Sequence, residues 1–367
     1  MPRIAVIGAG VAGLSAARRL VLAGHRPILI APDPAVPNRG ETLSPKALTL
    51  LEALQWAHLL DADSALPGEG RFSVWGDATL RKAPDHEGLG YHLDRAQFER
   101  LMRTALLTSD VERISSTVTA LTHQPGGVEL TTADRAVISV AAAIDCTGRA
   151  ALSSGAAAER RRLDRLIAAW RVLDLPDDAE TAAATLVEAI DLGWWYMSPL
   201  PGRRMMLGLF TDTDLLPTGV AQDGTRWANL AAGTIAIAPR LGSLGLEAIA
   251  AASPPAIAPA ASVTVSRLIE GRIVRAGDAA TALDPVSANG LATALWSGLQ
   301  AAAAALGLAK GAADAGAVYE RDYLQGVTQQ LATQQAMYAS EPRFAGAEFW
   351  RRRQTTPSES DHKERTA

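Results

Sequence analysis

The sequence predicts an α/β protein, α+β overall, in which a discontinuous parallel-sheet domain is combined with an antiparallel-sheet domain and C-terminal helices. The first observation is a βαβ pattern: an apolar run at residues 3–8, helical spacing over 11–23 and a second apolar run at 26–31. The second is a further strand and long helix at 272–309, near the opposite end of the chain. Three strand-like runs between 160 and 212 separate the two parts.

The remaining elements of the first domain follow from periodicity and turn residues. Helical spacing of apolar residues recurs over 46–60 and 93–107, the latter with a charged outer face, so both predict surface helices. Residues 111–145 alternate as strands do, and Pro125-Gly126-Gly127 indicates a hairpin. These strands should extend the first domain.

The antiparallel sheet rests on three runs of strand-forming residues. They cover 165–175, 193–200 and 204–210, and Pro201-Gly202 joins the last two as a hairpin turn does. The predicted boundaries are 1–70, 93–150 and 265–310 for the parallel-sheet domain, 71–92 and 151–264 for a substrate domain, 311–353 for C-terminal helices and 354–367 for a disordered polar tail.

Composition excludes several classes of function. The 367 residues carry 35 basic and 39 acidic side chains, a net charge of −4, which argues against a nucleic-acid partner. The single cysteine, Cys146, excludes a disulfide framework, and the scattered histidines predict no metal site. We find neither a run of about 18 apolar residues nor a secretory signal, so we expect a cytoplasmic protein without a membrane contact.

A glycine-rich turn follows the first predicted strand. Gly8, Gly10 and Gly13 form a G-x-G-x-x-G that opens the first helix. Gly8 permits the tight turn, Gly10 lets a pyrophosphate approach the backbone, and Gly13, with Ala12 beside it, allows the helix to lie close to the strand. The helix N-terminus favours the anion. This pattern predicts a Rossmann-like, dinucleotide-binding domain.

The second strand lacks the acidic residue that usually binds the ribose about 18 to 20 residues after the motif. Ala31 occupies that place, and Asp33 follows two residues later. Asp33 either reaches the ribose or serves only as a turn residue between two prolines. We therefore expect the dinucleotide to bind loosely.

A second motif resembles the flavoprotein monooxygenases and flavin-dependent halogenases. Gly277-Asp278-Ala279-Ala280, followed by Asp284-Pro285 and by Gly290 and Leu291, is similar to their second FAD fingerprint. The resemblance implies that Asp278 receives the ribityl hydroxyls and that the following loop and helix start lie beside the flavin ring. Residues 144–149 (IDCTGR) are similar to the segment where the dinucleotide sheet closes, and there we expect Cys146 to be a small buried residue.

Five further segments carry a more specific resemblance. The segments are Arg39–Pro45, Phe72–Gly76, Tyr91–Arg95, Gly193–Tyr196 and Phe349–Arg352. They resemble flavoproteins of tryptophylquinone biogenesis: the partners of lysine ε-oxidase and glycine oxidase, and the tryptophan-hydroxylating enzyme that matures quinohemoprotein amine dehydrogenase. The resemblance extends to about residue 353.

Three departures separate this sequence from the related halogenases. Arg71 stands at the position of the halogenase lysine, and arginine does not readily form a chloramine. Ser287 stands at the position of the halogenase glutamate. The W-x-W-x-I-P pattern keeps only Trp194 and Pro199. Together they make halogenation improbable.

The catalytic residues remain unknown, with four candidates. Arg39 and Glu41 precede a predicted helix and could contact the flavin or the substrate; the alternative for Glu41 is that it only caps that helix. His92 either faces the site or makes a structural hydrogen bond. Ser287 is the fourth. The candidates for the substrate cavity are Arg71, Trp75, Trp194, Trp195 and Tyr196. Strand alternation places Trp195 on the face opposite Trp194 and Tyr196. Either one of these faces lines the substrate cavity, or all three rings pack in the core.

The resemblance implies an FAD-dependent monooxygenase that hydroxylates a tryptophan of a protein substrate through a flavin C4a-hydroperoxide. NADH or NADPH would donate electrons transiently, because no second nucleotide motif is present. The implied client is a small amine dehydrogenase subunit, modified in the cytoplasm. The alternatives are a monooxygenase or halogenase of a small aromatic metabolite and a noncatalytic client-binding maturation factor.

Overall fold

The structure is a computed structural model that describes residues 1–33, 40–84, 88–154, 159–312 and 314–354. The chain divides into two compact units. The first comprises residues 1–67, 87–164 and 261–329, and the second comprises 68–86, 165–260 and 330–367. The first unit thus takes in residues 87–92, 151–164 and 261–264, which were predicted for the substrate domain, and 311–329 of the predicted C-terminal helices. Residues 68–70, predicted for the first domain, lie in the second unit.

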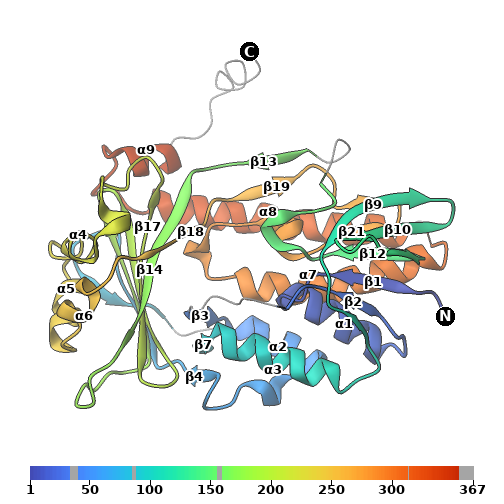
Figure 1. Cartoon of the computed structure of the whole chain (residues 1–367). Helices are drawn as coiled ribbons and strands as arrows, with labels where there is room; N and C mark the ends of the chain where they lie inside the picture. Colours follow the sequence, from blue (N-terminus) through green and yellow to red (C-terminus); the bar gives the residue numbers. More distant parts are fainter. Residues whose placement is uncertain (34–39, 85–87, 155–158, 313, 355–367) are drawn as a thin grey trace. The chain divides into compact units, whose positions relative to one another are not determined.

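A six-stranded sheet forms the centre of the first unit (Figure 1). Its order is β20 (Ile269–Glu270), β21 (Ile273–Arg275), β12 (Ala142–Asp145), β1 (Ile4–Ile7), β2 (Ile28–Ile30) and β8 (Glu112–Ile114). All neighbours are parallel except β20 and β21. Every residue of β1 and β12 is buried, as expected of a parallel sheet covered on both faces. The predicted discontinuous α/β domain is confirmed.

The long helix α7 (Gly290–Ala309) packs against α1 (Val11–Leu22) through small residues. A Cβ at Gly298 would overlap the Ala12 carbonyl oxygen, and the Ser15 hydroxyl donates to the Leu295 carbonyl at 2.8 Å. By length and composition alone α7 is apolar enough to cross a membrane, although no such run was predicted from the sequence. Half of its apolar window is buried inside the structure, and a core helix of a globular protein has the same composition.

Smaller elements complete the first unit. Three-stranded sheets are formed by β11 (Val137–Val140), β10 (Gly127–Thr132) and β9 (Val118–Gln124); by β3 (Gly40–Leu43), β7 (Tyr91–Asp94) and β4 (Ala65–Pro67); and by β13 (Arg160–Arg162), β19 (Val263–Val265) and β22 (Thr281–Ala282). The helices are α2 (Pro45–Ala53), α3 (Arg95–Leu107), the 3-10 turns Ala57–Leu59 and Gly148–Ala150, and α8 (Asp314–Ala339), which continues into the second unit. The predicted hairpin between β9 and β10 is present.

A seven-stranded sheet is the core of the second unit. Its order is β18 (Ala256–Pro259), β14 (Leu166–Asp174), β17 (Arg204–Asp212), β16 (Gly193–Leu200), β15 (Ala184–Ile190), β5 (Gly70–Val74) and β6 (Leu80–Lys82). The three predicted strands are β14, β16 and β17, and they are antiparallel. Strand β15 was not predicted, and its pairing with β5 is parallel.

Short helices pack beside this sheet (Figure 1). They are α4 (Gly224–Asn229), α5 (Ile237–Ser243) and α6 (Glu247–Ala251), preceded by a 3-10 turn at Val220–Gln222. Trp195 of β16 and Trp227 of α4 meet in the same hydrophobic core, with ring centroids 5.5 Å apart. Buried Glu188 of β15 accepts the backbone N–H groups of Ala236 and Ile237 at 2.8 and 2.9 Å, which stabilises the start of α5.

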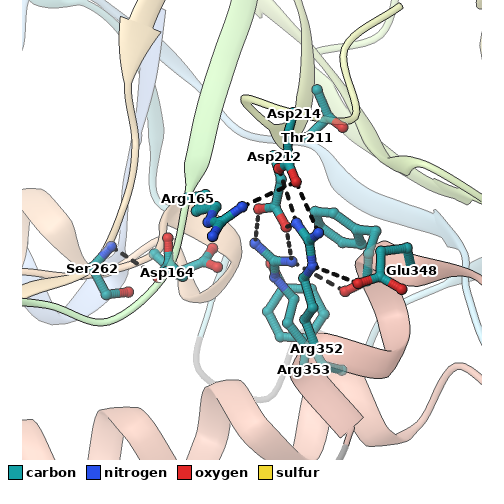
Figure 2. A network of polar contacts seen from close by, with 12 residues as sticks. Asp164, Arg165, Thr211, Asp212, Asp214, Ser262, Glu348, Arg352 and Arg353 are labelled. Carbon is teal, nitrogen blue, oxygen red and sulfur yellow. Dashed lines mark hydrogen bonds and ion pairs between the residues drawn. The ribbon is translucent and has the colours of Figure 1, made fainter. Parts of the chain in front are cut away.

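The terminal helix α9 (Glu348–Gln354) is held to the end of β17 by ion pairs, shown in Figure 2. Arg353 Nη2 lies 2.6 Å from buried Asp212 Oδ1, and Arg352 Nη1 lies 2.9 Å from Asp212 Oδ2. Arg352 Nη2 also lies 2.8 Å from Asp214 Oδ2. Two arginines of α9 thus pair with the carboxylates of Asp212 and Asp214 at the end of β17.

Acid should weaken this attachment, and Asp214→Asn should remove part of that pH dependence. The hydrogen bond from Arg352 lowers the pKa of Asp214 from 3.8 to about 2. Because the folded pKa is the lower one, the stabilisation is complete above about pH 4 and is lost as the pH falls towards 2. Because the Asp214 side chain is 39% exposed, we expect the pair to contribute less than about 1 kcal/mol to the free energy of unfolding.

The measurement is thermal unfolding of both proteins at several pH values, followed by circular dichroism. The difference in unfolding temperature between the wild type and Asp214→Asn should be largest near neutral pH and should narrow in acid. A difference that stays constant down to about pH 2 would contradict the assignment.

Candidate functional site

The glycine-rich turn lies between β1 and α1, and its three glycines have different reasons to be glycine. Gly8 has a φ of +103° and donates its N–H to the Ile30 carbonyl at 2.9 Å. A Cβ at Gly13 would overlap the Gly8 carbonyl oxygen, so Gly13 is required by packing. A Cβ at Gly10, in contrast, would meet no described atom within 4 Å. Nothing inside the chain requires Gly10, as expected where a ligand approaches the backbone.

The second fingerprint lies against the first. Gly277, in the 3-10 turn Gly277–Ala279, has a φ of +59°, and a Cβ there would lie 2.8 Å from the Cβ of Ala12. Asp278 follows with half of its side chain exposed, and its Oδ2 lies 3.7 Å from Arg149 Nε. The fold therefore brings residues more than 260 positions apart into one site, as both motifs predict.

The loop before α7 is the third segment that contributes to the candidate FAD site. Buried Asp284 accepts the Val286 N–H at 2.9 Å and opens the 3-10 turn Pro285–Ser287. Gly290 begins α7, and a Cβ there would again meet no described atom within 4 Å; Leu291 is buried behind it. The first turn of α7 carries no side-chain cap from Asn289, which leaves the positive end of the helix for an anionic or electron-rich group.

Sequence reasoning missed Arg103, which reaches the glycine-rich turn from α3. Its Nη2 donates to the Ala9 carbonyl at 3.2 Å, and its Nε is buried without a partner among the described residues. Burial lowers the pKa of Arg103, but an arginine remains charged. Its spacing is the signal that was available: Arg95, Glu99 and Arg103 are four residues apart and share one helix face.

We expect Arg103→Met to weaken binding of FAD and of ADP about tenfold, or about 1.4 kcal/mol, because it removes a cation from beside the pyrophosphate position. Riboflavin, which has no phosphate, should bind the variant as it binds the wild type. Fluorescence titration and calorimetry measure the three affinities. An equal loss for riboflavin would show that Arg103 acts through the fold alone.

Asp33, the alternative carboxylate for the ribose, has a partner of its own on the surface. It forms an ion pair with Arg113 and its side chain is 79% exposed. Ala31, at the usual acidic position, is buried. Arg39, the other candidate from this part of the chain, lies outside the described residues.

Glu41 and His92 lie on the small sheet next to α3. Glu41 Oε2 lies 2.6 Å from Arg95 Nη1, and Arg95 also pairs with Glu99. The charges of Glu41, Glu99 and Asp278 raise the pKa of Arg95 despite its burial. His92 is buried opposite Thr42 in the β3–β7 pair. Arg95 thus connects Glu41 electrostatically with the second fingerprint.

The IDCTGR segment is structural. Asp145 is buried and accepts hydrogen bonds from the backbone and hydroxyl groups of both Thr147 and Ser153, at 2.6 to 3.0 Å. Cys146 is buried as expected, and burial, assisted by the charge of Asp145, raises the pKa of its thiol well above the usual range. The thiol is therefore neutral and a poor nucleophile.

The predicted cavity residues all belong to the second unit. Arg71 donates to the Pro84 carbonyl at 3.0 Å, and Trp75 Nε1 donates to the Met337 carbonyl at 2.9 Å. Trp194 stacks on Phe210 with ring centroids 4.0 Å apart and donates to the Tyr338 hydroxyl at 3.1 Å. These rings pack within their own unit.

The strand alternation predicted for β16 is present. Trp195 packs with Trp227 in the core, whereas Trp194 contacts Phe210 and Tyr338. Tyr196 is half-buried. Trp195 is thus a core residue, and the cavity roles of the other rings stay predictions.

The residues of the first unit fit FAD. Gly10 and Gly290 leave room for a ligand at the backbone, and Arg103 offers a buried N–H without a partner among the described residues. The Asp278 carboxylate is half-exposed, and the two fingerprints follow one another along the chain in the order that FAD binding requires. Within the described residues, no group of three or more metal-ligating side chains is present.

Known proteins share this architecture. LodB of Marinomonas mediterranea, named as an FAD-dependent oxidoreductase, is 26% identical over 95% of this chain and 95% of its own. The solved peptidyl tryptophan dihydroxylase QhpG, essential for tryptophylquinone cofactor biogenesis, matches 98% of this chain and 80% of its own, with a TM-score of 0.79 and 24% identity. The flavin-dependent halogenase CmlS matches 100% and 70%, with a TM-score of 0.74 and 22% identity.

The solved structures show that the fold is that of flavin-dependent halogenases and monooxygenases, as predicted. Residues 69–367 match the family described as tryptophan halogenase. The chain is a flavoprotein oxidoreductase with two FAD fingerprints in one site. It belongs to the tryptophan halogenase family.

Proposed function

We propose that this chain is an FAD-dependent monooxygenase that hydroxylates a tryptophan side chain of a protein substrate during tryptophylquinone formation. The observation that carries the proposal is the similarity over 98% of this chain to QhpG, which is named as a peptidyl tryptophan dihydroxylase and so supports a protein substrate. The resemblance to halogenases also implies that Arg71 and Ser287 stand where those enzymes have lysine and glutamate. Arg71 stays protonated, and its Nη2 donates to the Pro84 carbonyl.

The described residues have defined tasks in this function. Gly10 and Arg103 would receive the pyrophosphate, and Asp278 would receive the ribityl hydroxyls. The uncapped start of α7 would stabilise negative charge on the flavin ring. Bound reduced flavin supplies the two electrons that activate dioxygen.

The overall reaction converts an aromatic C–H bond to C–OH. One oxygen atom of O2 enters the product and the other leaves as water, with two electrons and one proton from NADH or NADPH and a second proton from solvent. The nicotinamide would visit transiently, or an external reductase would supply the electrons. We expect the reaction to take place in the cytoplasm, with a small amine dehydrogenase subunit as the client.

The test combines the purified full chain with FAD, NADH, chloride, 18O-labelled O2 and the recombinant small subunit of an amine dehydrogenase. Intact-protein mass spectrometry and peptide mapping follow the product. The expected result is labelled oxygen on one tryptophan. Parallel reactions contain free tryptophan, to test a small-molecule substrate.

Halogenation is the second candidate, because the family is named for it. Incorporation of chlorine without oxygen would overturn the monooxygenase proposal. Oxygen on free tryptophan alone would reject the protein substrate. If flavin is bound but neither substrate changes mass, even when an added flavin reductase supplies reduced flavin, a noncatalytic client-binding role would replace both.

A further inference from the structure

An arginine strand lies at the edge of a sheet in the first unit. Strand β13, Arg160–Arg162, is the outer strand of the sheet β13-β19-β22 and pairs antiparallel with β19 (Figure 1). Glu159 and Leu163, which flank it, are hydrogen-bonded to Ser266 and Ser262 of the β19 side at 2.9 Å. Because alternate residues of an antiparallel strand face the partner, Arg161 also faces β19, and the N–H and C=O groups of Arg160 and Arg162 point to the open edge.

The arginine side chains of β13 are exposed, and none forms an ion pair among the described residues. Only Arg162 makes a side-chain hydrogen bond, from Nε to the Asp164 carbonyl at 2.9 Å. Some other exposed arginines, such as Arg81 with Asp77 and Arg321 with Asp322, have carboxylate partners, whereas single exposed arginines such as Arg19 and Arg135 have none among the described residues. What distinguishes β13 is that three consecutive arginines without carboxylate partners lie on one edge strand.

Exposed charge on an edge strand prevents pairing with ordinary strands, but it favours one class of partner. A strand that carries carboxylates at alternate positions would form main-chain hydrogen bonds with Arg160 and Arg162 and would neutralise their side chains. A neutral strand would leave the arginine charges without partners, and a basic strand would repel them. The surface is therefore selective for an extended acidic segment.

We propose that β13 binds an extended acidic segment of the protein substrate as a fourth strand of this sheet. The proposal rests on the proposed function for the existence of a protein client. It adds where the client docks and what the docking segment contains: an unfolded or edge strand rich in Asp or Glu. Docking there would raise affinity for the client without touching the flavin residues.

The test uses the full chain and a fluorescein-labelled octapeptide of alternating Glu and Val, followed by fluorescence anisotropy. The variant Arg160→Glu/Arg162→Glu should bind at least about tenfold more weakly than the wild type. The matched control is Arg19→Glu/Arg135→Glu, which makes the same charge change at two exposed arginines elsewhere in the first unit and should retain binding. An octapeptide N-methylated on one edge should also lose binding, because it cannot pair as a strand.

Three outcomes would overturn the proposal. Equal binding of the methylated and unmethylated peptides, or an equal loss in the control variant, would mean that only non-specific charge attraction is present. With the protein client, the double variant should show a raised KM and an unchanged kcat. If the double variant hydroxylates the client with an unchanged KM, the docking proposal fails and the proposed function stands. If the peptide binds as expected but no client is hydroxylated, the acidic-strand site stands and the proposed function fails.

Discussion

Replacing Gly10 by valine is expected to leave the chain folded and to remove most of its affinity for FAD. The backbone at Gly10 is extended, with φ −80° and ψ −178°, a conformation that valine adopts readily. A Cβ there would meet no described atom within 4 Å, so the fold does not oppose it. The added side chain would occupy the space that the pyrophosphate needs, and we expect at least about a hundredfold weaker binding, or about 2.7 kcal/mol.

The matched control for Gly10→Val is Gly13→Val. Its Cβ would overlap the Gly8 carbonyl oxygen, so this variant should unfold at lower temperature whether or not FAD is present. Titration of flavin fluorescence measures FAD affinity, and circular dichroism measures thermal unfolding. If Gly10→Val keeps its affinity for FAD, the pyrophosphate does not approach this turn, and the assignment of the first fingerprint is wrong.

The parts of the site that could be predicted are those that local sequence determines. The glycine turn, the second fingerprint and the main strands β1, β2, β14, β16 and β17 could be predicted, because spacing and residue type along a short stretch of chain indicate them. Arg103 could not be found in this way. Its role depends on the meeting of α3 with the turn near Ala9, a contact between segments 94 positions apart.

The second unit shows the same limit in its sheet. Strand β15 was missed, although Thr185, Val187 and Ile190 are strand-forming residues. It is held by two neighbouring strands and by Glu188, which accepts backbone N–H groups at the start of α5. Its parallel pairing with the distant strand β5 is not set by local sequence. The same applies to Asp33: sequence places it near the ribose position, but only the fold shows that Arg113 pairs with it.

The terminal Phe349–Arg352 segment is the clearest case of a motif whose structural purpose emerges from the fold. Trp350 is 0% exposed and lies among aromatic rings, with its centroid 5.2 Å from that of Trp75 and 5.8 Å from that of Tyr338. Its indole N–H donates to the Ile190 carbonyl of β15 at 2.7 Å. The motif therefore attaches the C-terminal helix to the sheet of the second unit.

Trp350→Ala should consequently destabilise the second unit by about 3 to 5 kcal/mol, since it leaves a large cavity and an unpaired carbonyl. Trp350→Phe keeps most of the buried ring but loses the hydrogen bond to Ile190, so it should cost only about 1 to 2 kcal/mol. Urea unfolding followed by tryptophan fluorescence and circular dichroism gives both values. Equal losses for the two variants would mean that the hydrogen bond, and not ring packing, holds α9 in place. A loss below about 1 kcal/mol for Trp350→Ala would contradict the assignment of Trp350 as the main attachment of α9 to the sheet.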